Sequence, residues 1–161
     1  MIESIYGLLN KAELEFLKNE CVNFEEEVFQ IYSAQNKRHL VKTSLDNYIS
    51  NVNNYIKKIG ANFILSDIWI NKITKNSNLD EKFHKDASDF SIVTYINREY
   101  VGGDLEWINK FGKIEKIVPI ENLSILIPKN VPHKVTNVID GTRYSLALFF
   151  KYDTKLKKTL L

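Results

Sequence analysis

The apolar pattern of the chain changes character at Gly60. Before this residue, apolar side chains recur at helical spacing in residues 10–32, where Asn10 can serve as the N-cap. They recur in the same way in residues 44–60, a second predicted helix that Gly60 closes. After Gly60, β-branched and aromatic residues form short runs separated by polar breaks, which is typical of strands.

The runs after Gly60 predict eight strands, at residues 62–73, 83–86, 90–97, 104–109, 114–118, 123–128, 132–138 and 142–151. Between the last two, Asp140-Gly141 is a two-residue hairpin signal that predicts antiparallel pairing. Eight short antiparallel strands behind a helical segment predict an α+β, mainly β, fold. The expected architecture is a double-stranded β-helix (jelly roll) with the N-terminal helices packed on one sheet. Such a barrel can hold a small ligand inside.

The length of 161 residues predicts a single domain, 1–161, with 1–60 as helical support and 62–151 as the jelly-roll core. No apolar run approaches the ~20 residues of a membrane span. The opening "MIESIYGLLNKAELEFL" has no basic start followed by a long apolar stretch, so we expect no secretory signal and a cytoplasmic protein.

Charge and cysteine content exclude some classes of function. A net charge of +2, without a Lys/Arg run interleaved with aromatic residues, argues against a nucleic-acid partner. The single cysteine, Cys21, excludes an internal disulfide framework and a cysteine-based zinc site, and we expect it to pack within a helix. The sequence does not predict the oligomeric state.

His84 and Asp86 stand two residues apart at the start of a predicted strand. Residues i and i+2 of a strand point to the same face about 6.5 Å apart, so both side chains can reach one metal ion. A lone His-x-Asp is also common in solvated loops, so the metal interpretation needs a third ligand. His133, at the start of a distant strand, offers it. Two histidines and one carboxylate form the facial triad of non-haem Fe(II) oxygenases, which leaves positions open for a chelating cosubstrate and dioxygen.

Arg143 follows His133 by ten residues, and Ser145 lies two residues further on the same face of the last predicted strand. A guanidinium that faces the interior of a barrel needs an anion, because an unpaired buried charge is very costly. We therefore expect an anion site beside the metal, which a dicarboxylate cosubstrate can fill.

The motifs "HKD", "TYIN", "GGDLEW" and "PHKVTNVIDGTRYSL" together resemble the prolyl 4-hydroxylase-like branch of the 2-oxoglutarate- and Fe(II)-dependent dioxygenases. The resemblance covers residues from about 62 to 151. It implies that His84, Asp86 and His133 bind iron. It also implies that Arg143 pairs with the far carboxylate of 2-oxoglutarate.

Other positions follow from the same resemblance. Tyr95, in "YIN", would reach that carboxylate as well, and Ser145 matches a hydroxyl often found beside the arginine. Gly102 and Gly103 match the Gly-Gly turn of the family, although glycine's backbone freedom explains a turn there without any ligand. We expect Trp107 to pack in the hydrophobic core.

Two departures from the family pattern stand out. The family commonly has a glycine where this chain has Asn122, a residue that tolerates a positive φ. The family tyrosine on the strand before His-x-Asp is absent from "SDIWINKIT", where Trp69 or Asn71 can take its place.

The resemblance implies a hydroxylase of the prolyl 4-hydroxylase type that couples decarboxylation of 2-oxoglutarate to C–H hydroxylation. It would use Fe(II), 2-oxoglutarate and dioxygen, with ascorbate as a further candidate. Peptidyl proline is the default substrate of the family. A free amino acid or other small molecule is an open alternative, and so is a non-catalytic cupin-like metal-binding module.

Overall fold

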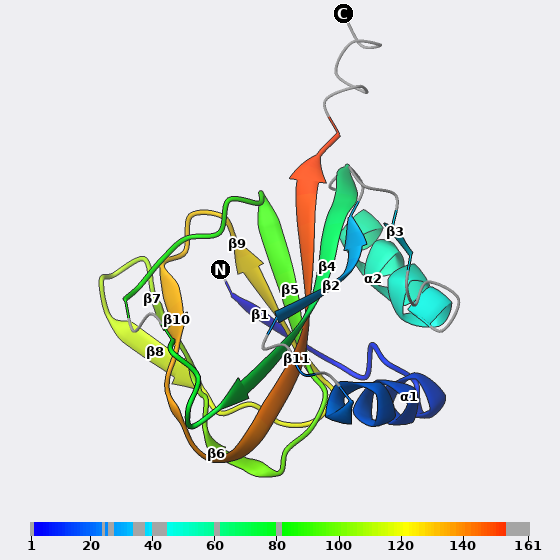
Figure 1. The fold of residues 1–161 in the computed structure, drawn as a ribbon. Helices are drawn as coiled ribbons and strands as arrows, with labels where there is room; N and C mark the ends of the chain where they lie inside the picture. Colours follow the sequence, from blue (N-terminus) through cyan, green and yellow to red (C-terminus); the bar gives the residue numbers. More distant parts are fainter. Residues whose placement is uncertain are drawn as a thin grey trace, which may run out of the picture.

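Two antiparallel sheets face each other across the interior of the protein (Figure 1). The computed structural model describes residues 2–23, 25, 28–33, 38–39, 45–59, 62–79 and 82–153. The large sheet runs in the order β1 (Glu3–Tyr6), β9 (Leu123–Pro128), β5 (Phe90–Tyr95), β11 (Val138–Tyr152), β4 (Phe63–Thr74), β2 (Val28–Ser33) and β3 (Arg38–His39), and β6 (Tyr100–Gly102) pairs with β11. The small sheet runs in the order β10 (His133–Val135), β7 (Leu105–Ile108) and β8 (Ile114–Ile117).

The chain alternates between the two sheets after residue 62. From β4 in the large sheet it passes to His84, which forms an isolated bridge with His133 of β10. It returns to the large sheet in β5 and β6, crosses to β7 and β8, and then visits β9, β10 and β11 in alternate sheets. Segments far apart in the sequence therefore meet across the interior, where the predicted site residues lie.

Helices α1 (Lys11–Val22) and α2 (Asp46–Lys58) cover the outer face of the large sheet (Figure 1). One buried core joins the helices to that face; it includes Leu17 and Cys21 of α1, Val52 of α2 and Leu146 of β11. Burial raises the pKa of the Cys21 thiol to about 12, so this cysteine serves packing, as predicted.

The two helices are also tied by one buried carboxylate. Asn10 caps α1 as predicted, in a capping box in which the Asn10 side chain accepts from Glu13 N at 2.9 Å and Glu13 Oε2 accepts from Asn10 N at 2.9 Å. The other oxygen, Oε1, accepts from the backbone N of Tyr48 in α2 at 2.8 Å. Each buried oxygen thus has a donor, which fixes the helices against each other.

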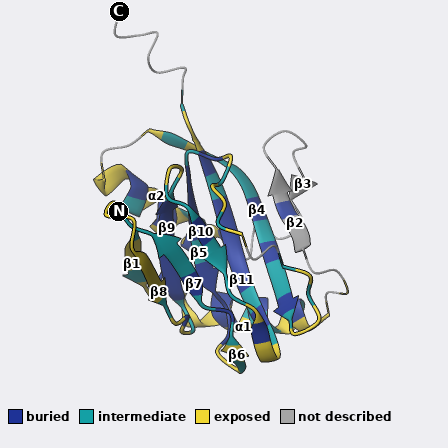
Figure 2. Ribbon diagram, turned by 90° about the vertical axis from the view of Figure 1, so that its left-hand side faces the viewer, coloured by how far each residue is buried: buried dark blue, intermediate teal, exposed yellow. Residues whose placement is uncertain are grey.

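A second core fills the space between the sheets. It contains Tyr95, Leu105, Leu123, Ile125 and Ile127. Burial is high in the centre of the large sheet, where residues 145–148 of β11 are all buried (Figure 2). Neither helix of the described residues has the length and apolar character that a bilayer crossing demands.

Several predicted elements need correction in the N-terminal part. The helix predicted over 10–32 ends at Val22, and residues 28–33 form strand β2 instead, because this β-branched and aromatic segment pairs with β4. The first sixty residues are therefore not purely helical: β1, β2 and β3 join the large sheet. Strands β1, β3 and β6 were not predicted, and predicted strand 83–86 is only the bridge at His84.

The predicted hairpin at Asp140-Gly141 is wrong. Residues Val138–Tyr152 form one continuous strand, and β10 pairs with β7 rather than with β11. The Asp-Gly pair instead lies beside a register irregularity opposite β6, with Gly141 at φ 75°. A Cβ on Gly141 would overlap the Glu99 carbonyl oxygen, so the glycine allows β6 to approach closely.

Candidate active site

His84, Asp86 and His133 lie together at one end of the space between the sheets. The backbones of His84 and His133 face each other in an antiparallel bridge, with N···O distances of 3.0 and 2.9 Å. Their rings therefore share a face, and the ring centroids are 4.6 Å apart. One ligand atom from each of the three residues lies within 4.8 Å of the others. The structure thus brings the three predicted metal ligands together.

Hydrogen bonds orient two of these side chains. His133 Nδ1 lies 3.0 Å from the Val131 carbonyl oxygen, which assigns the proton to Nδ1 and leaves the Nε2 lone pair free. That Nε2 lies 3.7 Å from Asp86 Oδ1. The other oxygen, Asp86 Oδ2, accepts a 2.6 Å hydrogen bond from Ser91 Oγ on β5. Such outer partners hold the ligand atoms toward a common centre.

The donor set fits a divalent first-row metal ion. Two imidazole nitrogens and one carboxylate oxygen suit Fe(II), and three protein ligands leave the other coordination positions open. His133 is buried, whereas His84 is exposed. The cluster is therefore reached from solvent on the His84 side and closed by the protein on the other.

A group of buried polar atoms without partners lies on the inner face of the large sheet. Arg143 is 2% exposed, and within the described part of the chain its Nε has no hydrogen-bond partner. The same holds for the hydroxyl oxygens of Tyr95, Tyr100 and Ser145. Buried polar groups are normally hydrogen-bonded, so this cluster has the chemistry of an anion site.

Strand pairing places these groups side by side. Tyr95 on β5 is the register partner of Ser145 on β11, which is the partner of Asn71 on β4. Arg143 lies two residues from Ser145 on the same face, and its Cζ lies 4.9 Å from the centroid of the Tyr95 ring. The predicted neighbours Arg143, Tyr95 and Ser145 are thus brought together.

The two phenols stay protonated at neutral pH. Burial raises the pKa of Tyr95 and raises the pKa of Tyr100 to about 12, while the Arg143 charge acts in the opposite direction on both. Each phenol can therefore donate a hydrogen bond to an anion that Arg143 attracts.

Gly103 shapes this cluster. It has φ 69°, and a Cβ at this position would lie 2.8 Å from Arg143 Cδ and 3.4 Å from a ring carbon of Tyr100. Gly102, at φ 81°, is required for the turn, since its Cβ would overlap the Asn137 carbonyl oxygen. The Gly-Gly pair is therefore a turn and also leaves room for the arginine.

The structure also answers the two departures seen in the sequence. Asn122 has φ 59°, as its tolerance of positive φ predicted, and its side chain bonds the backbone N and O of Leu9 at 3.2 and 2.8 Å. Trp69 and Asn71 both point to the inner face of β4, because Ile68 and Ile70 face the helices. Asn71, opposite Ser145, lies nearer the arginine cluster.

Sequence reasoning missed Ser91 and Tyr100. Ser91 lies five residues after Asp86, a spacing with no meaning until β5 is placed. Tyr100 depends on the pairing of β6 with β11. Its position two residues before the Gly-Gly turn was the only signal available in the sequence.

No protein-family model and no curated protein matches the chain, whereas solved structures do. An oxidoreductase of the 2OG-Fe(II) oxygenase family from Burkholderia pseudomallei has a TM-score of 0.70 at 20% identity, over 93% of this chain and 84% of that chain. The viral collagen prolyl hydroxylase of Paramecium bursaria Chlorella virus-1 has a TM-score of 0.70 at 15% identity, over 94% and 90%. HygX from Streptomyces hygroscopicus, solved with nickel, 2-oxoglutarate and hygromycin B, has a TM-score of 0.71 at 9% identity, over 95% and 83%.

The chain has the fold of these oxygenases. The likeness extends over helices α1 and α2 as well as both sheets, because it covers at least 93% of this chain in each comparison. Within this fold, His133 of the cluster belongs to the small sheet and the arginine cluster belongs to the large sheet.

Proposed function

We propose that the protein is a 2-oxoglutarate- and Fe(II)-dependent oxygenase built on a jelly roll. The observation that carries the proposal is a pair of clusters: a His-Asp-His cluster, and a buried arginine cluster without an anion partner among the described residues. Strand β5 contributes to both, with Ser91 bonded to Asp86 and Tyr95 beside Arg143. The alternation of the chain between two facing sheets supports the jelly roll.

In this proposal His84, Asp86 and His133 hold the metal, with Ser91 and the Val131 carbonyl fixing the orientation of two of them. HygX structures contain iron, or nickel with 2-oxoglutarate, in the same fold. Bound Fe(II) and 2-oxoglutarate supply the oxidative chemistry, which converts 2-oxoglutarate and dioxygen to succinate and carbon dioxide as a substrate C–H bond is hydroxylated.

Arg143 binds the distal carboxylate of the cosubstrate, and the hydroxyls of Tyr95, Tyr100 and Ser145 donate to the same group. These four residues form the distal pocket. Its role is to fix one end of the cosubstrate in a place where water is scarce, so that the keto acid end faces the metal ligands. The viral prolyl hydroxylase has also been solved as a 2-oxoglutarate complex.

For the substrate we propose hydroxylation of prolyl 4-hydroxylase type, on a peptidyl proline. Two of the structurally similar proteins are prolyl hydroxylases, from the Chlorella virus and from Pseudomonas putida. A free amino acid or another small molecule is the alternative, since HygX is solved with hygromycin B.

The test is formation of succinate from 2-oxoglutarate in the presence of Fe(II) and dioxygen, with prolyl peptides and free amino acids as substrate panels. We expect turnover that depends on Fe(II) and is abolished in His84→Ala. Tight binding of Fe(II) and 2-oxoglutarate without succinate under any condition would indicate the non-catalytic metal-binding module instead.

A further inference from the structure

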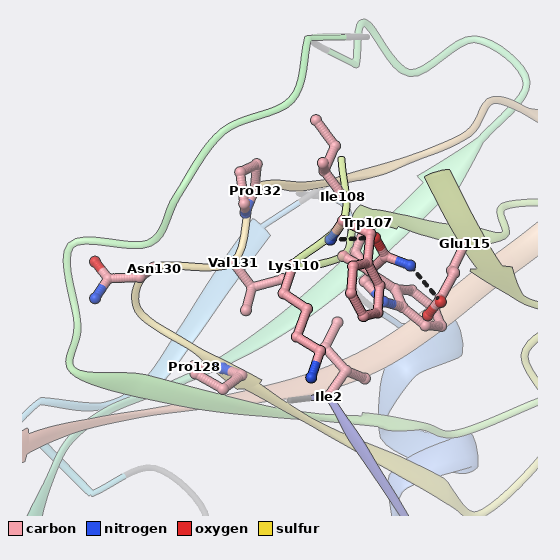
Figure 3. Close-up of a pocket in the computed structure, with 11 residues that line it drawn as sticks. Ile2, Trp107, Ile108, Lys110, Glu115, Pro128, Asn130, Val131 and Pro132 are labelled. Atoms are coloured by element: carbon pink, nitrogen blue, oxygen red, sulfur yellow. Dashed lines mark hydrogen bonds between the residues drawn. The ribbon is translucent and has the colours of Figure 1, made fainter. Parts of the chain in front are cut away.

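A cavity of about 750 Å³ lies beside Trp107 of the small sheet (Figure 3). Its walls come from the β7–β8 hairpin, the β9–β10 connection and the start of β1. Its apolar lining includes Trp107, Phe111, Pro128, Val131 and Ile2. Its size is that of small-molecule sites, roughly 300–1,000 Å³.

Strand register joins this cavity to the metal site. His84 is the partner of His133, His133 of Trp107, and Trp107 of Glu115. Direct partners in adjacent strands point to the same face, so the four side chains form one row across the small sheet. Strands lie about 4.8 Å apart, which places the Trp107 backbone one such step from His133 and that of Glu115 two steps away. The row begins at the metal ligands and ends in the cavity wall.

The cavity is apolar within and polar at its rim. Lys110 and Glu115 are exposed, and the Glu115 carboxylate accepts from Asn109 Nδ2 at 2.7 Å. Phe111 is 74% exposed at the tip of the hairpin, with Lys110 Nζ 5.0 Å from its ring centroid. The exposed ring of Phe111 thus continues the apolar lining of the cavity out to its rim.

We propose that this cavity binds an apolar side chain of the substrate, aromatic, branched aliphatic or prolyl, next to the metal. The inference rests on the proposed oxygenase function and adds a substrate class to it. An apolar cavity binds apolar groups of a ligand better than hydroxyl groups, because burying a hydroxyl without a hydrogen-bond partner costs free energy. The bound group enters past Phe111 and stacks on Trp107, one strand from His133.

The experiment uses Trp107 fluorescence. The chain has two tryptophans, so Trp69→Phe leaves Trp107 as the sole reporter. The protein is loaded with Mn(II) and 2-oxoglutarate and titrated with N-acetyl methylamides of leucine, phenylalanine and proline, and with those of serine and glutamine as polar probes. We expect saturable binding of the apolar probes and much weaker binding of the polar ones. Calorimetry on the unaltered protein provides a second measurement that does not depend on Trp69→Phe.

A matched pair of variants locates the binding. Phe111→Ser removes the rim aromatic, and Ile114→Ser removes a similarly exposed side chain of the same hairpin that does not line the cavity. Phe111→Ser should weaken apolar probe binding about ten-fold, the usual effect of truncating an aromatic anchor, and Ile114→Ser should leave it unchanged.

Four results would overturn the proposal: no binding of any probe, equal binding of polar probes, equal effects of the two variants, or a dimer that Phe111→Ser dissolves, which would mean that a second copy covers the cavity. Succinate formation is measured on the same preparations. Turnover without probe binding contradicts only the cavity proposal, whereas probe binding without turnover contradicts the oxygenase function.

Discussion

Replacing Arg143 by methionine should separate cosubstrate binding from folding. Arg143 is 2% exposed and its Nε has no partner among the described residues. In the proposed complex the guanidinium forms parallel N–H···O bonds to the distal carboxylate, in a place with little water. Removing one partner of such a charge pair costs about 2–5 kcal/mol, which is roughly thirty-fold to several thousand-fold in affinity.

The same substitution should not destabilise the ligand-free protein. A buried charge without a partner opposes folding, and an apolar side chain of similar length removes that cost. We therefore expect Arg143→Met to bind 2-oxoglutarate at least thirty-fold more weakly while its free energy of unfolding in urea stays equal or rises. Affinity for Mn(II) should be unchanged, because the three metal ligands are untouched. Such opposite effects on binding and stability are typical of functional sites.

The assay is calorimetric titration of the Mn(II)-loaded protein with 2-oxoglutarate and with pyruvate. Pyruvate keeps the keto acid but lacks the distal carboxylate, so the natural protein should strongly prefer 2-oxoglutarate and Arg143→Met should lose most of this preference. Arg143→Lys is the control for charge alone, since lysine cannot form the two parallel bonds. Equal discrimination by the natural protein and Arg143→Met would refute the role given to this arginine.

Four further predictions follow from the site. His84→Ala should abolish metal binding and succinate formation yet keep cooperative unfolding, because the barrel has its own core; loss of cooperativity would make the residue structural. Tyr95→Phe and Tyr100→Phe should each weaken 2-oxoglutarate binding in calorimetry, and unchanged affinity in either variant would remove that hydroxyl from the pocket. In the natural protein, the affinity for 2-oxoglutarate should not fall between roughly pH 7 and 9, because burial raises both phenol pKa values. Gly103→Ala should weaken 2-oxoglutarate binding but not Mn(II) binding, since its Cβ would displace the guanidinium stem; equal losses of both would indicate general misfolding. Ser91→Ala should lower Mn(II) affinity about ten- to a hundred-fold, as loss of an outer ligand partner does; native affinity would show that its 2.6 Å hydrogen bond is dispensable.

Local sequence patterns predicted most of the strands after Gly60, because a strand needs only a short β-branched or aromatic run. The strand expected at 123–128 has the observed bounds Leu123–Pro128, and helix α2 falls within the predicted 44–60. The sequence predicted less well which strands pair with each other. An Asp-Gly pair such as Asp140-Gly141 is found both in hairpin turns and in strand irregularities that need a glycine. Only the pairing of β6 with β11 shows that the second case applies here.

The same distinction separates the site residues that were predicted from those that were not. The proposed metal ligands follow from spacing along the chain and from family motifs, and the structure brings them together. Ser91 and Tyr100 act through contacts that exist only after distant strands pair, so no spacing in the sequence marks them. The end of the first helix at Val22 has the same origin, because β2 gains its partner from β4.

The division of the site between two sheets has a mechanical consequence. An isolated backbone bridge holds His84 against His133 of the small sheet, without any contribution from the large sheet. The arginine cluster belongs to the large sheet. Asp86 connects the two, because it belongs to the metal cluster while its Oδ2 accepts from Ser91 of β5 in the large sheet. The position of Asp86 therefore depends on contacts with both sheets, through Ser91 of β5 and His133 of β10.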